Sequence, residues 1–170
     1  MRILLIVVAG IVLLVSTVVM IGSLLPKRHV ASSSASYRAM PERLFSLITG
    51  PQDWRPDVLS CEALPSADGR ELMRETTRHG KTITYELLDR MPPWSVKRRI
   101  STENLPYSGT WTFSLRANDG ITIVQITEDG QVYNPVFRFV SRFILGQTHT
   151  MDAYLRALGK ATGQEIEVTH

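Results

Sequence analysis

The side chains that could carry out chemistry in this sequence of 170 residues are few and far apart. The sequence contains no HExxH or CxxC pattern and no glycine-rich phosphate loop. His149 lies near Gln147 and Asp152 in a predicted helix, where an exposed helix-face histidine explains it better than a general base. We therefore predict no catalytic residue, no metal ligand and no bound cofactor. The remaining histidines flank an apolar run, occupy a turn and end the sequence: His29, His79 and His170.

Two further features could suggest reactivity, and each has a simpler explanation. The single Cys61 lies in an apolar-leaning strand, which predicts a buried, inert thiol rather than a nucleophile. It cannot form a disulfide within the chain, so the redox compartment stays open. The adjacent carboxylates Glu128 and Asp129 precede Gly130, a pattern that favours a turn over acid–base catalysis.

The distribution of charge argues against nucleic acid as a partner. The formal net charge is +3, but Arg2, Lys27 and Arg28 all flank the apolar N-terminal run. Without them, 16 basic residues balance 16 acidic ones, so the rest of the chain lacks the basic surface that binds phosphate backbones. The short basic run 97–99 is interpreted as a solvated strand edge.

The N-terminal run Ile3–Leu25 contains no charged side chain. About 23 residues rising 1.5 Å each can cross the hydrocarbon core of a bilayer, so we predict a single-pass transmembrane anchor over residues 1–28. The alternative is a cleaved signal peptide with a site at Ser34-Ala35-Ser36, but the run is long and ends in Pro26-Lys27-Arg28-His29. Basic residues flank the run on both sides, so the side of the membrane that holds the soluble domain stays open.

The remainder of the chain begins with a short helix and continues as strands. Pro41 and Glu42 suit the first turn of a helix over residues 40–50, and Gly50-Pro51 ends it. Apolar residues then alternate with polar ones, which predicts an antiparallel sheet. The strand candidates are 58–64, 70–77, 81–90, 94–102, 110–116 and 121–127, with turns at Asp68-Gly69, His79-Gly80 and Asn118-Asp119-Gly120.

The C-terminal part changes to helical spacing. Asn134 and Pro135 are a suitable N-cap and first-turn residue. Apolar side chains then recur from Val136 to Leu158, which predicts one helix of about 25 residues that could kink at Gly146. The small residues 30–37 form either a flexible linker or a strand.

Six aromatic side chains are expected to point into the space between sheet and helix. The ordinary explanation is a packed core, and the functional one is that some of them line an apolar ligand cavity. Asn134 and Arg138 could hold a polar headgroup, but a helix cap and a surface charge explain them better. The cavity candidates are Tyr85, Trp111, Phe113, Phe139, Phe143 and Tyr154.

Taken in order, these segments resemble the START-like superfamily of polyketide cyclases and dehydrases, also called SRPBCC, which includes the birch-pollen allergen fold. The resemblance covers about residues 29–162, and its motifs are Pro41-Glu42-Arg43-Leu44-Phe45 through Trp54-Arg55-Pro56, Gly109-Thr110-Trp111-Thr112, and 127–130 followed by 134–139. It implies an α+β helix-grip domain over 29–163, in which a seven-stranded antiparallel sheet wraps around the long C-terminal helix. Residues 30–37 would then be the first strand, and 164–170 a short C-terminal tail.

The resemblance also implies a class of function. The family typically binds hydrophobic ligands such as lipids, sterols, polyketides or quinones, and it has no universal catalytic motif to carry over. We therefore predict a membrane-anchored, non-catalytic domain that holds a hydrophobic small molecule or lipid between sheet and helix. One alternative is a cyclase or dehydratase using the same cavity, which needs ionisable groups pointing inward. The other is an interaction protein whose interior is filled by side chains.

Overall fold

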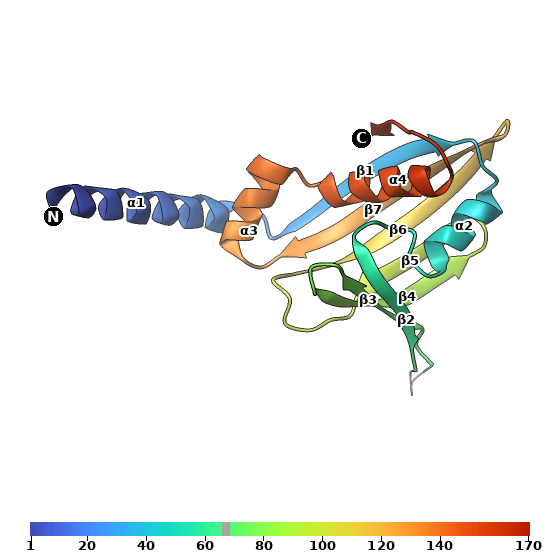
Figure 1. The fold of residues 1–170 in the computed structure, drawn as a ribbon, viewed down its shortest axis with the longest axis horizontal. Coiled ribbons are helices and arrows are strands. Elements are labelled where there is room, and N and C mark those ends of the chain that lie inside the picture. The colour runs from blue at the N-terminus through green and yellow to red at the C-terminus, as the bar shows by residue number, and fades with distance from the viewer. Residues whose placement is uncertain (66–68) are drawn as a thin grey trace.

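The computed structural model describes residues 1–65 and 69–170 (Figure 1). Asp68 of the predicted Asp68-Gly69 turn lies outside these residues. The helical elements are α1 (Arg2–Leu24), α2 (Pro41–Thr49), α3 (Pro135–Val140), the π-helical turn η1 (Ser141–Leu145) and α4 (His149–Ala161). The strands are β1 (Arg28–Tyr37), β2 (Val58–Leu64), β3 (Leu72–Thr77), β4 (Thr82–Met91), β5 (Ser95–Ile100), β6 (Tyr107–Asn118), β7 (Ile121–Val132) and β8 (Val168–Thr169).

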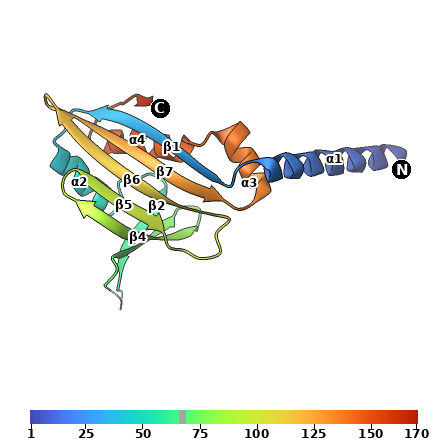
Figure 2. The same cartoon turned by 180° about the vertical axis from the view of Figure 1, so that it is seen from behind.

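The described strands form one antiparallel sheet in the order β2-β3-β4-β5-β6-β7-β1-β8. The sheet curves around α4, and α2 lies at the end of the domain away from α1 (Figures 1 and 2). This confirms the predicted α+β fold with an antiparallel sheet around the C-terminal helix. The strand count is corrected from seven to eight, because Val168 and Thr169 of the predicted tail pair with Ala35 and Ser34 of β1.

The serine-rich segment 30–37 is a strand and not a linker. Ser33, Ala35 and Tyr37 alternate along β1 and are all buried. Small side chains at the first two positions let α4 approach the strand closely. There, the Ser33 hydroxyl donates to Asp152 Oδ1 at 2.7 Å, and the Tyr37 hydroxyl donates to the Leu155 carbonyl at 2.9 Å. Side-chain contacts with α4 therefore add to the backbone ladder that β1 forms with β7.

The single helix predicted over 136–158 is divided, and the break between η1 and α4 falls at Gly146, where a kink was predicted. Gly146 has φ +80°, in the left-handed region, so its backbone cannot continue the right-handed helix. The C-terminal half behaves as predicted, with Met151, Tyr154, Leu155 and Leu158 buried against the sheet. The N-terminal half turns away toward α1 (Figure 1). The apolar stripe thus has two parts that face different surroundings.

Helix α1 projects from the domain as a long rod (Figures 1 and 2). It is long and apolar enough to cross a membrane, and none of its most apolar window is buried in the domain. Its last turn contacts α3 at Gly22, where a Cβ would collide with the backbone carbonyl of Pro135. The Asn134 side chain caps α3 as predicted by accepting the backbone N–H groups of Val136 and Phe137. The contact at Gly22 places the start of α3 beside the end of α1.

Candidate functional site

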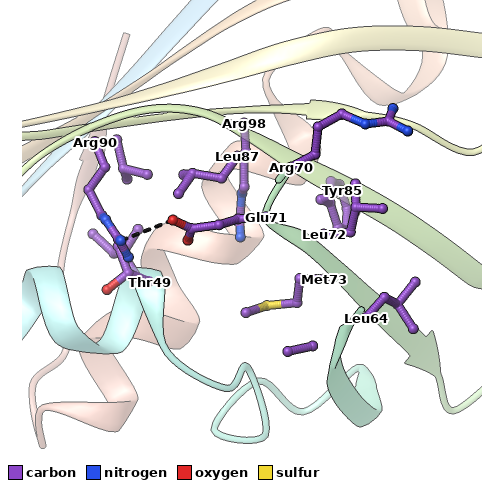
Figure 3. A pocket seen from close by; sticks show the side chains of 13 residues that line it. Thr49, Leu64, Arg70, Glu71, Leu72, Met73, Tyr85, Leu87, Arg90 and Arg98 are labelled. Carbon is purple, nitrogen blue, oxygen red and sulfur yellow. Dashed lines mark hydrogen bonds and ion pairs between the residues drawn. The ribbon is translucent and has the colours of Figure 1, made fainter. Parts of the chain in front are cut away.

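A cavity of about 270 Å³ lies between α2 and strands β2 to β5 (Figure 3). At its exposed rim, Arg90 Nη2 donates to Glu71 Oε1 at 3.2 Å. Its polar wall includes the Tyr85 ring and the Arg98 guanidinium. The volume is just below the range of about 300–1,000 Å³ that is common for small-molecule pockets. Its apolar wall is formed by Ile48, Leu64, Leu72, Met73, Leu87 and Val96.

Strand alternation brings Arg98 to this cavity. Val96 and Arg98 are two residues apart on β5, so both side chains point to the inner face of the sheet, while Lys97 and Arg99 between and beyond them are exposed. β5 is paired on both sides, with β4 and with β6. The interpretation of run 97–99 as a solvated strand edge is therefore wrong for Arg98, whose side chain is only 11% exposed.

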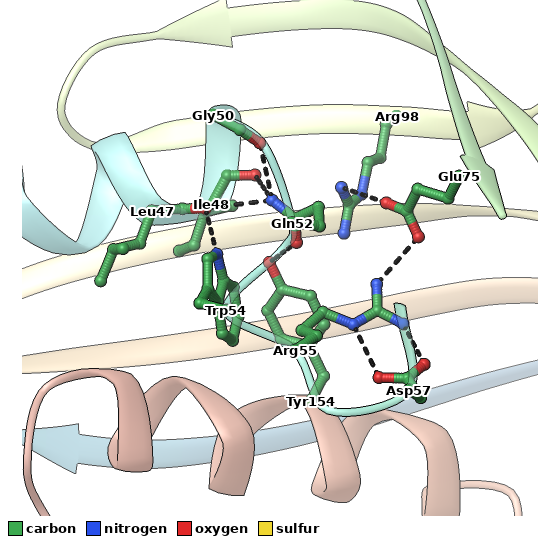
Figure 4. Close-up of polar contacts among 10 residues, drawn as sticks. All are labelled: Leu47, Ile48, Gly50, Gln52, Trp54, Arg55, Asp57, Glu75, Arg98 and Tyr154. Atoms are coloured by element: carbon green, nitrogen blue, oxygen red, sulfur yellow. Dashed lines mark hydrogen bonds and ion pairs between the residues drawn. The ribbon is translucent and has the colours of Figure 1, made fainter. Parts of the chain in front are cut away.

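Next to the cavity lies a buried cluster of charges (Figure 4). The Glu75 side chain on β3 is 3% exposed, and its Oε2 accepts from Arg55 Nη1 at 2.9 Å. Arg55 also holds Asp57 Oδ2 at 2.6 Å, and Arg98 Nη1 lies 3.9 Å from Glu75 Oε1. Within the described part of the chain, Glu75 Oε1 and Arg98 Nε have no hydrogen-bond partner. Buried polar atoms are rarely left in this state, which makes the cluster a candidate for ligand recognition.

Tyr154 connects this cluster to α2. Its ring lies 5.3 Å from Arg55 Cζ and 5.6 Å from Arg98 Cζ, distances at which a guanidinium is attracted to the aromatic face. Its hydroxyl donates to Gln52 Oε1 at 2.9 Å. The Gln52 amide nitrogen, with two hydrogens to donate, lies within 3.0 Å of the carbonyls of Leu47, Ile48 and Gly50 at the C-terminal end of α2. Helix α2, helix α4 and the charged cluster therefore form one connected unit.

The structure separates the six aromatic candidates into three places. Tyr85 lines the cavity. Trp111, Phe113 and Tyr154 pack against one another with ring centroids 5.3 to 5.9 Å apart, so side chains fill the space beneath α4 that we expected to be open. Phe139 and Phe143 lie on α3 and η1, in contact with each other at 5.0 Å, because the chain turns away at Gly146. Direct ligand contact by any of the six stays a prediction.

Sequence reasoning missed the charged members of the site. Glu75 and Arg98 lie in strands where polar residues are ordinarily assigned to the outer face, and Arg55 lies in a turn. A signal was present for Arg98, because it falls in phase with Val96 and Ile100 on the alternating pattern of β5. Glu75 is likewise two residues from the cavity-lining Met73 on β3, but a carboxylate is ordinarily assigned to the solvent side of a strand.

Ser33, Asp152 and His170 come together elsewhere in a serine–histidine–aspartate grouping. Ser33 Oγ lies 3.3 Å from His170 Nδ1, and His170 Nε2 lies 3.7 Å from Asp152 Oδ2. However, the Ser33 hydroxyl donates directly to Asp152, and Ser33 is only 1% exposed. An activated nucleophile requires a base that accepts its proton and a path for substrate, so this grouping is a hydrogen-bonded link between β1, α4 and the C-terminus.

Burial controls the ionisation of three tyrosines. Removal from water raises the pKa of Tyr154 above its usual value, against the opposing effect of Arg98 and Arg55. Burial likewise raises the pKa of Tyr85, with Glu75 adding to the effect, and raises the pKa of Tyr37. Each phenol is therefore held in its neutral form. Burial also raises the pKa of the half-buried Cys61 thiol, which keeps it in the unreactive protonated form.

An alkaline titration should detect these neutral tyrosines. Because the pKa values of Tyr37, Tyr85 and Tyr154 are raised on folding, their contribution to stability is complete below about pH 10 and is lost as the pH rises further. We expect their ionisation, followed by absorbance at 295 nm, to coincide with loss of near-UV circular dichroism. Reversible ionisation of all tyrosines near pH 10 with the fold intact would contradict this assignment.

Three solved structures with similar backbones illustrate the fold, and one of them is named as a START superfamily protein. A conserved protein from Geobacillus kaustophilus matches with a TM-score of 0.65 and 17% identity, over 84% of this chain and 100% of that chain. A START superfamily protein from Mycobacterium smegmatis matches with a TM-score of 0.62 and 16% identity, over 79% of this chain and 97% of that chain. Norcoclaurine synthase from Thalictrum flavum matches with a TM-score of 0.61 and 12% identity, over 81% of this chain and 88% of that chain. At these identities the likeness shows the fold alone.

The family follows from the sequence itself. Residues 28–161 match the family of polyketide cyclase / dehydrase and lipid transport proteins. The chain therefore belongs to this family, and the resemblance found in its sequence motifs is confirmed. No curated protein sequence matches the chain significantly.

Proposed function

We propose that this chain is a membrane-anchored START-like domain that binds a small amphipathic molecule without transforming it. The observation that carries the proposal is the cavity of about 270 Å³, whose apolar wall ends at the Arg98 guanidinium. A guanidinium among the lining residues favours an anionic or hydrogen-bond-accepting group on the ligand. The volume suits one acyl chain or one ring system and is too small for a whole phospholipid.

The same cavity distinguishes binding from catalysis. A cyclase or dehydratase would need an acid or base within reach of the ligand. The carboxylate that lines the cavity, Glu71, lies at its exposed rim and accepts from Arg90. Glu75, the carboxylate nearest to Arg98, is not among the lining residues and is already held by Arg55. This arrangement favours a binding role for the charged cluster, in which Glu75 orients the two arginines.

The proposed anchor is α1. It ends at Leu24 and β1 begins at Arg28, so a bilayer around α1 would lie within a few residues of the domain. The alternative signal-peptide cleavage site, Ser34-Ala35-Ser36, falls inside β1, which pairs with β7 along its whole length. Cleavage there would remove most of β1, which supports retention of α1. Intact mass measurement of the membrane fraction should therefore give the whole chain of 19.1 kDa, resistant to alkaline carbonate extraction.

Ligand binding can be tested with decanoate, a single-chain anion, and decanol, its uncharged analogue. We expect the full chain, released from phosphatidylcholine nanodiscs, to retain decanoate more strongly than decanol by native mass spectrometry. Met73→Trp places an indole in the cavity and should weaken decanoate binding about tenfold, a change of about 1.4 kcal/mol. Leu59→Trp, at an exposed position of β2 outside the cavity, is the matched control.

Two results would contradict the binding proposal. One is a domain that is always empty after gentle purification and takes up neither probe. The other is equal loss of decanoate in Met73→Trp and Leu59→Trp. Thermal unfolding of both variants separates loss of the site from overpacking, which costs about 1–3 kcal/mol in a well-packed core.

A further inference from the structure

A second cavity, of about 320 Å³, lies where α1 meets the domain. Five of its lining residues carry or can carry positive charge: Lys27, Arg28, His29, Arg138 and Arg142. None of its lining residues is acidic. The cavity is formed by the link between α1 and β1, by the end of β7, and by α3 and η1. It therefore gathers cations at the carboxyl end of the apolar helix.

Of these five residues, two lie beside a carboxylate and, among the described residues, three do not. Arg28 forms an ion pair with Asp129 at 2.6 Å, and His29 lies 3.5 Å from Glu128. In the described ranges, Lys27, Arg138 and Arg142 have no carboxylate within 4.0 Å. The cavity therefore has an excess of positive charge that favours an anion.

Arg138 gives this site a fixed donor. It is 7% exposed, and its Nη1 donates to the Leu25 carbonyl at 2.7 Å. Leu25 directly follows the last turn of α1. Among the described residues, its Nε has no hydrogen-bond partner. A guanidinium held in place at a cavity wall with an unused donor is suited to a phosphate oxygen.

An apolar surface adjoins the cavity on α3 and η1, a segment that we call the elbow (135–145). Phe143 is 59% exposed and Ile144 is 67% exposed, with Val136, Phe137 and Leu145 also exposed. Soluble surfaces seldom place this many large apolar side chains together. The elbow contacts α1 at Gly22, so its apolar surface continues that of α1. The combination of an apolar surface and neighbouring cations is typical of segments that lie in a membrane interface.

We propose that the elbow lies in the bilayer interface and that the cavity binds the phosphate of an anionic phospholipid. The inference rests on the proposed membrane anchoring by α1. A free phosphate ion would satisfy the cations, but it would leave the apolar surface of the elbow in water. A lipid satisfies both, because its headgroup and acyl region lie next to each other. Binding here would hold the domain at a fixed tilt on the membrane, separately from ligand binding in the cavity beside α2.

Lipid retention tests the cationic site. The full chain in nanodiscs of phosphatidylcholine with phosphatidylglycerol is analysed by native mass spectrometry for lipids that remain bound. We expect phosphatidylglycerol to be enriched, and Lys27→Gln with Arg142→Gln to reduce the enrichment by roughly fivefold for each cation removed. The control Arg156→Gln with Lys160→Gln removes the same charge from exposed positions on α4 and should leave enrichment unchanged. Equal effects of the two pairs, or displacement of the lipid by equimolar inorganic phosphate, would overturn the proposal.

A fluorescent probe tests the position of the elbow. In a Cys61→Ser background, an environment-sensitive dye is attached to Ile144→Cys or, as a control, to Ala153→Cys on the exposed face of α4. We expect a blue-shifted emission at position 144 that lipids brominated near the headgroup quench, and a water-like emission at position 153. Water-like emission at both positions would show that the elbow faces solvent.

Experiment can tell an incorrect elbow site from an incorrect membrane anchor. If alkaline carbonate extracts the chain from membranes, α1 is not an anchor and both ideas fall. If the chain resists extraction but shows neither lipid enrichment nor quenching at position 144, the anchor stands and the elbow site is wrong. Decanoate binding in the α2 cavity is measured independently of both.

Discussion

Arg55→Met is expected to destabilise the domain by about 3–5 kcal/mol, the usual cost of removing one partner from a buried ion pair. The Glu75 carboxylate is almost completely buried, and Arg55 is its only cation at hydrogen-bond distance in the described structure. Without it, Glu75 keeps only Arg98 at 3.9 Å. Urea unfolding of the full chain in detergent micelles, followed by tryptophan fluorescence, measures the loss. A decrease below about 1 kcal/mol, as for exposed pairs, would show that the Glu75 site is hydrated.

Two controls accompany this prediction. Arg74→Met removes an ion pair between the same strand, β3, and Glu62 on β2, but both side chains are exposed, so its cost should be about 0–1 kcal/mol. Arg55→Met with Glu75→Met removes the closest buried pair and should recover part of the stability, while the Arg98 guanidinium, 11% exposed, loses its carboxylate neighbour. A double variant as unstable as the single one would indicate that packing by the Arg55 side chain dominates.

Tyr154→Ala is expected to have an effect of similar size, about 3–5 kcal/mol, because it removes a large buried aromatic side chain. Its ring contacts Trp54, Trp111 and Phe113, so the substitution opens a void between α4 and the sheet. Since Trp54 and Trp111 are direct neighbours, their fluorescence should report the change locally as well as through unfolding. A loss of less than about 1 kcal/mol would mean that the surrounding side chains collapse into the void.

Tyr154→Phe separates the hydroxyl from the ring. The ring contacts are retained, but Gln52 Oε1 loses its donor in a fully buried site, which should cost about 1–3 kcal/mol. Tyr133→Phe removes the same group from a half-exposed tyrosine whose hydroxyl lies 2.7 Å from Ser108 Oγ, and it serves as the comparison, with an expected change within about 0.5 kcal/mol. A phenylalanine variant as stable as the original protein would show that water replaces the lost hydroxyl.

Much of the fold could be predicted because its signals are local. The bounds of β2 (Val58–Leu64) match the prediction from alternation alone, and α2 lies within the predicted 40–50 segment. The hairpin at Asn118-Asp119-Gly120 is present, with positive φ angles at Asp119 and Gly120 as such turns require. The strand identity of 30–37 required the family resemblance, since serine and alanine carry little strand preference of their own.

The candidate site was predicted only in part, and Tyr85 is the aromatic candidate that lines the cavity. The expected cavity beneath α4 is occupied by Trp111, Phe113 and Tyr154, while the open volume lies beside α2. Whether an inward-facing aromatic side chain packs or lines a void depends on how closely two elements approach. No spacing in a sequence encodes that distance.

Local patterns in the amino-acid sequence were therefore sufficient for the apolar N-terminal helix, for strands β2 to β7 and for the family. Tertiary structure alone decided the burial of Glu75 with Arg55 and Arg98, the break at Gly146, and the meeting of α1 with the elbow. The physical reason is the sequence separation of the interacting residues. Alternation and helical spacing arise from neighbouring residues, whereas a buried charge cluster arises when segments 20 or more positions apart, such as those of Arg55 and Glu75, meet in the folded chain.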